Sequence, residues 1–333
     1  MIKLIPPYIT KNSKFYLVAP SFGCTTTPYK ERLEKTLITL PKKGHQVTVG
    51  PNCFLSDGIC ASNTPKLRAK EFMDAYESDA EVILSVGGGE MMVEILDYID
   101  FEKIKKLPPK WFVGFSDNTN LTFTLTTLTN TPTIYGPCAG AFHFNRYSYE
   151  TKDCYTMLFG EKNFKGYSKF EGKSKNENPL ANYRLTRKKI ITPYNYEKPF
   201  KGTIIGGNLD ILQNLCGTPY DNMKEYSKDK DIIFYFEACD LSPLGIKRAL
   251  LQLKRAGWFN NVKGFLSGRP LCLNQNIFGI SDKTAVTDVL SDFNVPILLN
   301  VDLGHIAPSL PMKNGIEATV EYKDSNIFIT YEK

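Results

Sequence analysis

The sequence predicts an α/β fold whose first half contains a doubly wound, largely parallel β-sheet. Two observations carry this prediction. Short apolar segments alternate with amphipathic helical segments through residues 15–135, which is the pattern of repeated strand–helix units. Several of the apolar segments also run directly into glycine or serine. Ligands of such sheets bind at the carboxyl ends of the strands, so functional residues are expected there.

The first two strand–helix units are marked by their helix starts. A strand expected at 15–19 is followed by a Thr-Pro pair and by leucines at helical spacing over 27–41. A second strand expected at 46–49 is followed by another Thr-Pro pair and one apolar helical face over 64–76. Proline at the first helical position after a threonine N-cap is a typical helix start. Both segments are therefore predicted to be helices.

The next strands end in residues with special backbone or chemical properties. An apolar strand at 81–86 runs into the triglycine at 87–89, and a helix is expected after it. The strand at 111–115 leads into a helix at 117–128, and a fifth strand is expected at 133–135. Three consecutive strands thus place polar or flexible residues at one edge of the sheet.

The length of 333 residues suggests two domains. We expect an N-terminal domain at 1–150, an irregular basic connection at 151–200 and a C-terminal domain at 201–333. Residues 161–201 hold eleven Lys or Arg against four Glu, which is typical of a solvated connection or of a basic rim that attracts an acidic substrate. Further strands are expected at 203–205, 231–236, 264–267 and 295–301.

Several classes of protein are disfavoured by the sequence. No apolar run approaches the roughly 18 residues of a membrane helix, and prolines interrupt the N-terminal MIKLIPPYIT before any signal-peptide core. We expect a cytoplasmic protein that contacts no membrane. The eight cysteines form no C-x-x-C pair, so reduced thiols are expected, with no metal and no cofactor. The basic segment carries no zinc-finger or RNA-binding signature, so no nucleic-acid partner is expected.

Ser116 is the candidate nucleophile. It stands between the apolar strand at 111–115 and the following helix, in the sequence G-F-S-D-N. This is close to the G-x-S-x-G nucleophile elbow, with Asn118 in place of the second glycine. The alternative is a serine that only caps the helix.

A serine nucleophile needs a base and an acid that orients the base. Of the three histidines, His45 follows a helix stop, which favours a capping or surface role, and His143 stays open. His305 is favoured because it follows an apolar strand and a glycine, although a structural role is the alternative. Glu237 ends another apolar strand, where a carboxylate needs a partner. The order Ser116, Glu237, His305 matches a known triad order.

The triglycine at 87–89 has three interpretations. It lacks the G-x-G-x-x-G and Gly-Lys-Ser/Thr patterns of phosphate-binding loops. It could form a tight turn. It could also supply an oxyanion hole, in which its backbone N–H and that of Asp117 face a developing negative charge.

Six motifs, in order across the chain, resemble the serine peptidases of the L,D-carboxypeptidase and microcin C immunity family. The resemblance implies a Rossmann-like N-terminal domain, a swivelling, β-rich C-terminal α/β domain and a homodimer. The motifs are G-G-G-E at 87–90, G-F-S-D at 114–117, I-Y-G-P at 134–137, G-G-N-L at 206–209, the strand-terminal Glu237 and D-L-G-H at 302–305.

The resemblance also implies roles for individual residues. It makes Ser116, Glu237 and His305 the catalytic triad. The remaining implied positions are the oxyanion hole, formed by Gly88 or Gly89 with Asp117, and a substrate contact at Asn208.

Two substrate classes divide this family. One branch removes the terminal D-alanine from cytoplasmic murein tetrapeptides, and the other hydrolyses aminoacyl sulfamoyl or phosphoramidate adenylates. Members of the second branch follow the glutamate with an acidic residue and a nearby arginine, whereas Glu237 is followed by Ala238, Cys239 and Asp240. The basic segment also lacks a tryptophan that could stack on adenine.

We therefore expect a serine carboxypeptidase that cleaves a D-residue from a short peptide. Hydrolysis of an aminoacyl-adenylate antibiotic is the first alternative. A binding protein without turnover is the second alternative, because fold alone does not establish catalysis. A dinucleotide oxidoreductase is disfavoured by the missing glycine fingerprint.

Overall fold

The computed structural model describes residues 5–58, 60–172, 178 and 180–332. The chain divides into two compact units. The first comprises Met1–Glu161 and Lys175–Asn182, and the second comprises Lys162–Ser174 and Tyr183–Lys333. No helix of the described residues is both long enough and apolar enough to cross a bilayer.

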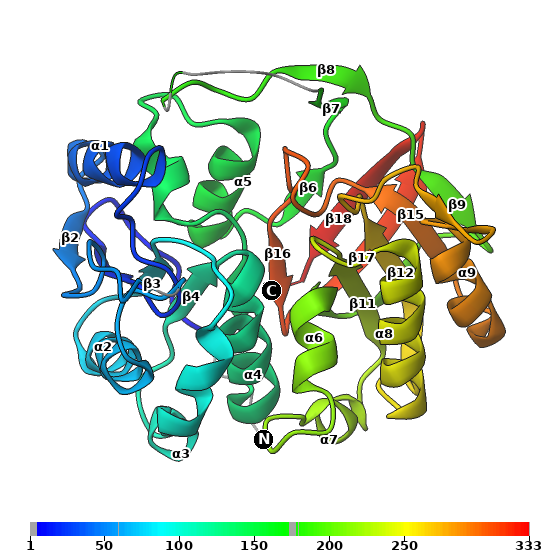
Figure 1. The fold of residues 1–333 in the computed structure, drawn as a ribbon, viewed down its shortest axis with the longest axis horizontal. Helices are drawn as coiled ribbons and strands as arrows, with labels where there is room; N and C mark the ends of the chain where they lie inside the picture. The colour runs from blue at the N-terminus through cyan, green and yellow to red at the C-terminus, as the bar shows by residue number, and fades with distance from the viewer. Residues whose placement is uncertain (1–4, 59, 173–177, 179, 333) are drawn as a thin grey trace. The chain divides into compact units, whose positions relative to one another are not determined.

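Five strands of the first unit form a parallel arrangement in the order β5-β4-β3-β1-β2 (Figure 1). Every residue of β3, β4 and β5 is buried, which is typical of parallel strands covered on both faces. The doubly wound sheet predicted for this half is confirmed. The strands are β1 (Lys14–Val18), β2 (Gln46–Val49), β3 (Val82–Ser85), β4 (Trp111–Gly114) and β5 (Thr133–Tyr135).

Helices cover both faces of this sheet, with α1 and α2 on opposite sides in Figure 1. The helix expected after the triglycine is a 3-10 helix, Met92–Tyr98. Its Met92, Ile95 and Leu96 are buried, whereas Val93 and Tyr98 are exposed. Two further 3-10 helices cover Ser116–Asn118 and Ala139–His143. The α-helices are α1 (Tyr29–Lys42), α2 (Pro65–Glu77), α3 (Phe101–Ile104), α4 (Thr119–Thr129) and α5 (Tyr149–Leu158).

The second unit contains an eight-stranded sheet in the order β6-β18-β17-β10-β11-β12-β15-β9. The strands β10, β11, β12 and β15 are parallel, and the remaining pairs are antiparallel. This is the second, β-rich half that the family resemblance implied. The strands are β6 (Asn163–Lys165), β9 (Thr192–Tyr194), β10 (Phe200–Asn208), β11 (Ile232–Glu237), β12 (Val262–Gly268), β15 (Ile297–Val301), β17 (Glu317–Lys323) and β18 (Asn326–Tyr331).

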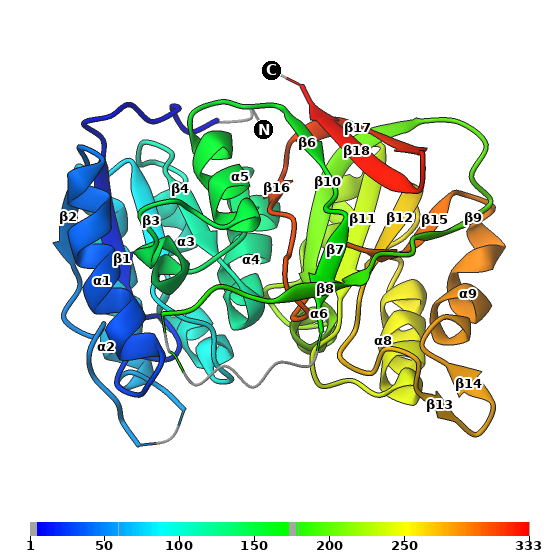
Figure 2. The ribbon, with the colours of Figure 1, turned by 90° about the horizontal axis from the view of Figure 1, so that it is seen from above.

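Helices α6, α8 and α9 lie together on one side of the parallel strands of this sheet (Figure 2). Helix α8 begins where the Ser242 hydroxyl accepts a hydrogen bond from the Gly245 N–H at 3.3 Å, a typical N-cap. The helices are α6 (Leu209–Leu215), α7 (Met223–Ser227), α8 (Pro243–Arg255) and α9 (Thr284–Leu290). Smaller elements of this unit are β13 (Asn276–Ile277), β14 (Ile280–Ser281), β16 (Met312–Asn314) and the 3-10 helix Ser291–Phe293.

The segment expected to be irregular at 151–200 contains more regular structure than predicted. It includes most of α5 and four short strands, of which β6 and β9 form the two edges of the eight-stranded sheet. The other two, β7 (Lys169–Glu171) and β8 (Leu185–Lys188), pair with each other. These strands have three or four residues each and carry many charges, as edge strands often do. Such short segments give no readable alternation of apolar and polar residues.

Candidate active site

Ser116 occupies a strained turn in the first unit. Strand β4 ends at Gly114, and the 3-10 helix Ser116–Asn118 leads directly into α4. The backbone of Ser116 has a φ angle of +64°, a left-handed conformation that costs free energy for a residue with a Cβ atom. Residues held in this way are concentrated at functional sites. The strand–turn–helix context predicted for the nucleophile is therefore present.

The side chain of Asn118 connects this turn to the triglycine through hydrogen bonds. Its Nδ2 donates hydrogen bonds to the carbonyl of Gly87 at 2.9 Å and to that of Phe115 at 2.8 Å. A Cβ atom on Gly114 would lie 2.5 Å from the Cγ atom of Asn118, so the position of this amide requires glycine at 114. Asn118, which stands in place of the second glycine of G-x-S-x-G, thus has a structural role in the turn.

Gly88 lies directly against Ser116. A Cβ atom on Gly88 would lie 3.0 Å from Ser116 Cβ and 3.4 Å from Ser116 Oγ. Gly89 has a φ angle of +150°, and a Cβ atom there would lie 2.3 Å from Ser21 Oγ. The triglycine therefore forms a tight turn whose backbone approaches the serine hydroxyl.

The side chain of Asp117 supports the same turn from within. It is buried, accepts hydrogen bonds from the Ser21 hydroxyl and, at 2.9 Å, from the Met92 N–H, and accepts another from Asn120 Nδ2 at 2.9 Å. Burial raises the pKa of the Asp117 carboxyl, and these hydrogen bonds oppose the rise. Because this carboxyl is engaged in the interior, the predicted oxyanion role concerns only the backbone N–H of Asp117.

Tyr135 is a further residue at the Ser116 turn, and no role was predicted for it from the sequence. The Ser116 N–H donates a hydrogen bond to the Tyr135 hydroxyl at 3.1 Å, and the Tyr135 ring packs at 4.9 Å from the Phe115 ring. Tyr135 ends β5 and belongs to the I-Y-G-P motif. That motif was the available signal, but it does not show which residue touches the serine.

Glu237 and His305 meet in the second unit, although they are 68 residues apart in the sequence. His305 Nδ1 lies 2.9 Å from Glu237 Oε2. The Glu237 side chain is fully buried, while the His305 side chain is 19% exposed, so part of it remains accessible. Burial disfavours the imidazolium, but the charge of Glu237 and hydrogen bonds with Cys239 and Glu237 raise the pKa of His305 above its usual value near 6.5.

Two glycines allow this close approach. Gly304 has a φ angle of +114°, and a Cβ atom there would lie 2.7 Å from the Arg269 carbonyl oxygen and 3.2 Å from Glu237 Oε2. A Cβ atom on Gly268 would lie 2.8 Å from Glu237 Cβ. A larger residue at either position would displace the loop that carries His305.

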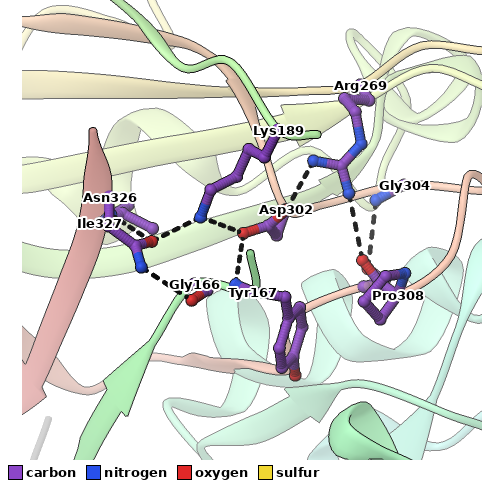
Figure 3. Close-up of polar contacts among 10 residues, drawn as sticks. Gly166, Tyr167, Lys189, Arg269, Asp302, Gly304, Pro308, Asn326 and Ile327 are labelled. Carbon is purple, nitrogen blue, oxygen red and sulfur yellow. Dashed lines mark hydrogen bonds and ion pairs between the residues drawn. The ribbon is translucent and has the colours of Figure 1, made fainter. Parts of the chain in front are cut away.

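A buried charge cluster anchors the start of the His305 loop (Figure 3). The Asp302 carboxylate accepts hydrogen bonds from Arg269 Nη1 at 2.6 Å, from Lys189 Nζ at 2.9 Å and from the Tyr167 N–H at 2.7 Å. Arg269 also donates from Nη2 to the Pro308 carbonyl at 3.3 Å. One guanidinium therefore holds both ends of the loop that contains His305.

The sequence did not identify most of this cluster. Asp302 was noted only as part of D-L-G-H, Arg269 carried no local signal, and Lys189 was counted with the basic connection. Burial lowers the pKa of Lys189, and Asp302 opposes the change. The lysine is thus a buried structural cation, which composition cannot distinguish from the exposed cations beside it.

Asn208 lies one strand from Glu237. The register of β10 and β11 pairs these two residues, and Asn208 Oδ1 caps α6 by accepting a hydrogen bond from the Asp210 N–H at 2.7 Å. The carboxylate of Asp210, also missed from the sequence, accepts hydrogen bonds from the N–H groups of Cys239 and Asp240, both at 2.9 Å. It thereby fixes the chain that follows Glu237.

The other two histidines are held inside the first unit. His45 Nε2 lies 2.7 Å from the Tyr155 hydroxyl, and His143 Nδ1 lies 2.7 Å from the Gly140 carbonyl oxygen. Both imidazoles are buried, and burial lowers the pKa of each. The expected surface position of His45 is therefore wrong, because the ring packs against Phe15 and bonds to Tyr155 in the interior.

The described residues thus contain two arrangements of candidate catalytic groups, one in each unit. The first unit offers a strained serine against a glycine turn, and the second offers a carboxylate–imidazole pair beside Asn208. In the described parts of the chain, no group of three or more His, Cys, Asp or Glu is arranged to hold a metal ion. All eight cysteines are free of disulfide bonds.

Curated relatives match nearly the whole chain. The microcin C7 self-immunity protein MccF of Escherichia coli is 27% identical over 92% of this chain and 90% of its own length. The probable murein peptide carboxypeptidase of Bacillus subtilis is 25% identical over 97% of this chain and 93% of its own length. The two relatives represent the two branches weighed above.

A solved structure of MccF in complex with glutamyl sulfamoyl guanosine has the same two-part fold. It superposes with a TM-score of 0.82 at 22% identity and covers 99% of both chains. Family models provide the assignment: the LD-carboxypeptidase N-terminal domain matches residues 16–136, and the LD-carboxypeptidase C-terminal domain matches residues 201–320. Together they cover more than half of the chain, in the expected order. The resemblance drawn from the six motifs is confirmed, and the chain belongs to the LD-carboxypeptidase family of serine-type peptidases.

Proposed function

We propose that this protein is a serine carboxypeptidase that removes the terminal D-amino acid from a short peptide of the murein type. Ser116 is the nucleophile, His305 the general base and Glu237 the carboxylate that orients His305. The hydrogen bond of 2.9 Å between Glu237 and His305 carries the proposal, because it fixes the imidazole tautomer with Nδ1 protonated.

The proposed reaction proceeds through an acyl-enzyme. His305 takes the proton of Ser116 through Nε2 as the serine oxygen attacks the scissile carbonyl. The backbone N–H groups of Gly88 or Gly89 and of Asp117 stabilise the oxyanion. His305 then protonates the leaving amine, and water attacks the acyl-enzyme with the same histidine as base.

The substrate class is inferred from the burial of the two tryptophans and from the residues that follow Glu237. Both tryptophans of the chain, Trp111 and Trp258, have no exposed surface, so neither is placed to stack on a nucleotide base. The sequence after Glu237 also departs from that expected for the nucleotide branch. The murein peptide relative in Bacillus subtilis supports the peptide alternative.

Hydrolysis of an aminoacyl-nucleotide is the second candidate. It is favoured by the similarity to the microcin C7 self-immunity protein and by solved structures of MccF with aminoacyl sulfamoyl nucleosides. The two reactions use the same nucleophile chemistry and differ in the leaving group.

A direct competition separates the candidates. The purified protein is offered a murein tetrapeptide and aspartyl sulfamoyl adenosine together, and both are followed by mass spectrometry. Consumption of the tetrapeptide with release of D-alanine is expected. Preferential consumption of the sulfamoyl adenosine would replace the peptide proposal with the second candidate.

A labelling experiment separates enzyme from passive binder. A fluorophosphonate should add once to the wild-type protein and not to Ser116→Ala, as measured by intact mass. Absence of labelling at Ser116, together with no turnover of either substrate, would favour a binding protein without catalysis.

A further inference from the structure

A pocket lies within the second unit, beside the anchored end of the His305 loop. Its volume is about 350 Å³, within the range of small-molecule sites. Parts of β8, the chain after β12 and the end of β15 contribute to it. The lining residues are Phe170, Arg187, Lys188, Ile190, Arg269, Leu273, Asn274, Lys283 and Asn300.

The charged residues of the lining are all basic. Four of its nine residues are cationic and none is acidic. The Arg269 charge is balanced by Asp302, whereas Arg187, Lys188 and Lys283 form no ion pair with any residue that the structure describes. Among the described residues, the pocket therefore presents three positive charges without an ion-pair partner, together with the amides of two asparagines.

Arg187 is positioned by an aromatic contact. Its guanidinium lies 5.0 Å from the centre of the Phe170 ring, and that of Arg269 lies 4.8 Å from the same ring. Phe170 is buried, so its ring is held in place and both guanidinium groups pack against it. Such cation–π contacts orient guanidinium groups without neutralising them.

The β7–β8 pairing concentrates charge further. Its register places Lys188 opposite Lys169, and like charges directly opposite each other destabilise a strand pair. An anion bound at Lys188 would reduce this repulsion, and Lys169 itself does not line the pocket.

We propose that this pocket is a binding site for a compact, multiply charged oxyanion, of phosphate or polycarboxylate type. Guanidinium and ammonium groups are the usual partners of such oxyanions, and the absence of an acidic lining residue removes any repulsion. The site belongs to the second unit alone and does not depend on the proposed hydrolysis. Arg269 connects it to Asp302 and so to the loop that carries His305.

Calorimetric titration of the full-length protein with pyrophosphate and with citrate tests the proposal. We expect one or both to bind, and to bind more weakly at 200 mM than at 50 mM NaCl, because salt screens the charges. Each of Arg187→Gln, Lys188→Gln and Lys283→Gln should weaken binding by roughly threefold to tenfold, and the triple variant by about a hundredfold.

A matched triple variant controls for the net charge of the protein. Lys198→Gln, Lys224→Gln and Lys323→Gln remove three exposed cations of the same unit that do not line the pocket. This variant should retain wild-type affinity, and circular dichroism should show both triple variants folded.

The outcomes are distinct. Binding of pyrophosphate alone identifies a phosphate compound, binding of citrate alone a polycarboxylate, and both results support the site. Failure of both probes to bind at concentrations up to about 10 mM, tenfold weaker than a millimolar site, would overturn it. Equal loss of affinity in the two triple variants would also overturn it. The anion would then be attracted by the net charge of the protein and not by the pocket. The titration reads binding and not turnover, so its result is independent of the peptidase proposal.

Discussion

The Ser116 turn of the first unit and the Glu237–His305 pair of the second unit are built by different physical means. In the first unit, Ser116 is placed by the backbone: a φ angle of +64°, a glycine that approaches its hydroxyl, and an asparagine amide bonded to two nearby carbonyls. In the second unit, His305 is placed by side chains that carry charge. Glu237 contacts its ring, and Arg269 and Asp302 hold its loop.

This difference predicts different responses to mutation. A backbone turn is specified by its own residues, so a change there should alter the reaction without unfolding the unit. A buried charge cluster connects distant segments, so removal of one member leaves the others without compensation. The predictions below test this contrast, from the largest expected effect to the smallest.

Ser116→Ala should cause the largest loss of activity. We expect kcat on the accepted substrate to fall by about 10⁴- to 10⁶-fold, since the nucleophile is lost. The unfolding temperature should stay close to that of the wild type, because alanine preserves the backbone N–H that bonds Tyr135. Steady-state kinetics and differential scanning calorimetry measure the two effects.

Ser116→Gly provides the control for backbone strain. Glycine adopts the left-handed conformation freely, so this variant should be as inactive as Ser116→Ala but more stable by about 1 kcal/mol. Retention of full hydrolytic activity by either variant would show that another residue is the nucleophile.

Glu237→Gln should have the next largest effect, with an altered pH dependence. The base acts only as neutral imidazole, and the wild-type pKa of His305 is raised, so kcat/KM should rise with pH through that raised pKa. In the variant, burial should lower the pKa of His305 with no carboxylate charge to oppose it. The rise of kcat/KM should therefore move to lower pH. The plateau should fall by about 10²- to 10⁴-fold, because the tautomer is no longer fixed.

The same substitution has a stability signature. A raised pKa in the folded state contributes stability that is complete below the unfolded value near 6.5 and is lost as the pH rises through the folded value. The stability difference between wild type and Glu237→Gln should therefore be larger at pH 6 than at strongly alkaline pH. Titration of the His305 ring by NMR should show a lower pKa in the variant, and an unchanged pKa would contradict the assigned pairing.

Asp302→Asn should destabilise the second unit. Arg269 and Lys189 would remain buried with a weaker acceptor, and breaking a buried ion pair costs about 3–5 kcal/mol. Denaturant unfolding measures this loss, and the NMR signal of His305 should shift because its loop is released. Lys201→Gln removes two exposed ion pairs, with Glu317 and Glu332, and should leave the unfolding midpoint nearly unchanged. Equal effects of the two substitutions would argue against a special role for the cluster.

Gly88→Ala should have the smallest effect of the four. The added methyl group would lie 3.0 Å from Ser116 Cβ and 3.4 Å from its Oγ, which requires a shift of a few tenths of an ångström. We expect kcat/KM to fall about tenfold to a hundredfold, or about 1.4–2.8 kcal/mol of transition-state stabilisation. In Gly140→Ala the new Cβ would lie 3.6 Å from its nearest neighbour, Arg32 Cβ, and kcat/KM should be unchanged. A wild-type rate in Gly88→Ala would exclude a tight oxyanion contact at that glycine.

Much of the first unit could be predicted from the sequence. The parallel strands appeared close to the expected positions, because apolar runs and Thr-Pro helix starts are local signals. The Ser116 turn was also predictable, since a serine between strand and helix forces a sharp bend. The contact with Tyr135 was not, because the two residues lie on different strands and only the sheet brings them together.

The second unit was less predictable. Strands β6 to β9 were missed because segments of three or four residues show no periodicity. They become strands only by pairing with each other or with the sheet edges. Lys189 was treated as part of a solvated segment, yet it is buried beside Asp302. Neither composition nor spacing distinguishes it from Lys188, its exposed neighbour.

The sequence by itself determined the doubly wound sheet, the family and the residues proposed for catalysis, because these depend on periodicity and on short motifs in a fixed order. Only the tertiary structure decided which charges are buried and which remain uncompensated. A carboxylate at 302 and cations at 189 and 269 are separated by many residues, and their free energy depends on burial and on each other's presence. No local sequence pattern indicates how deeply these groups are buried or which partners they meet.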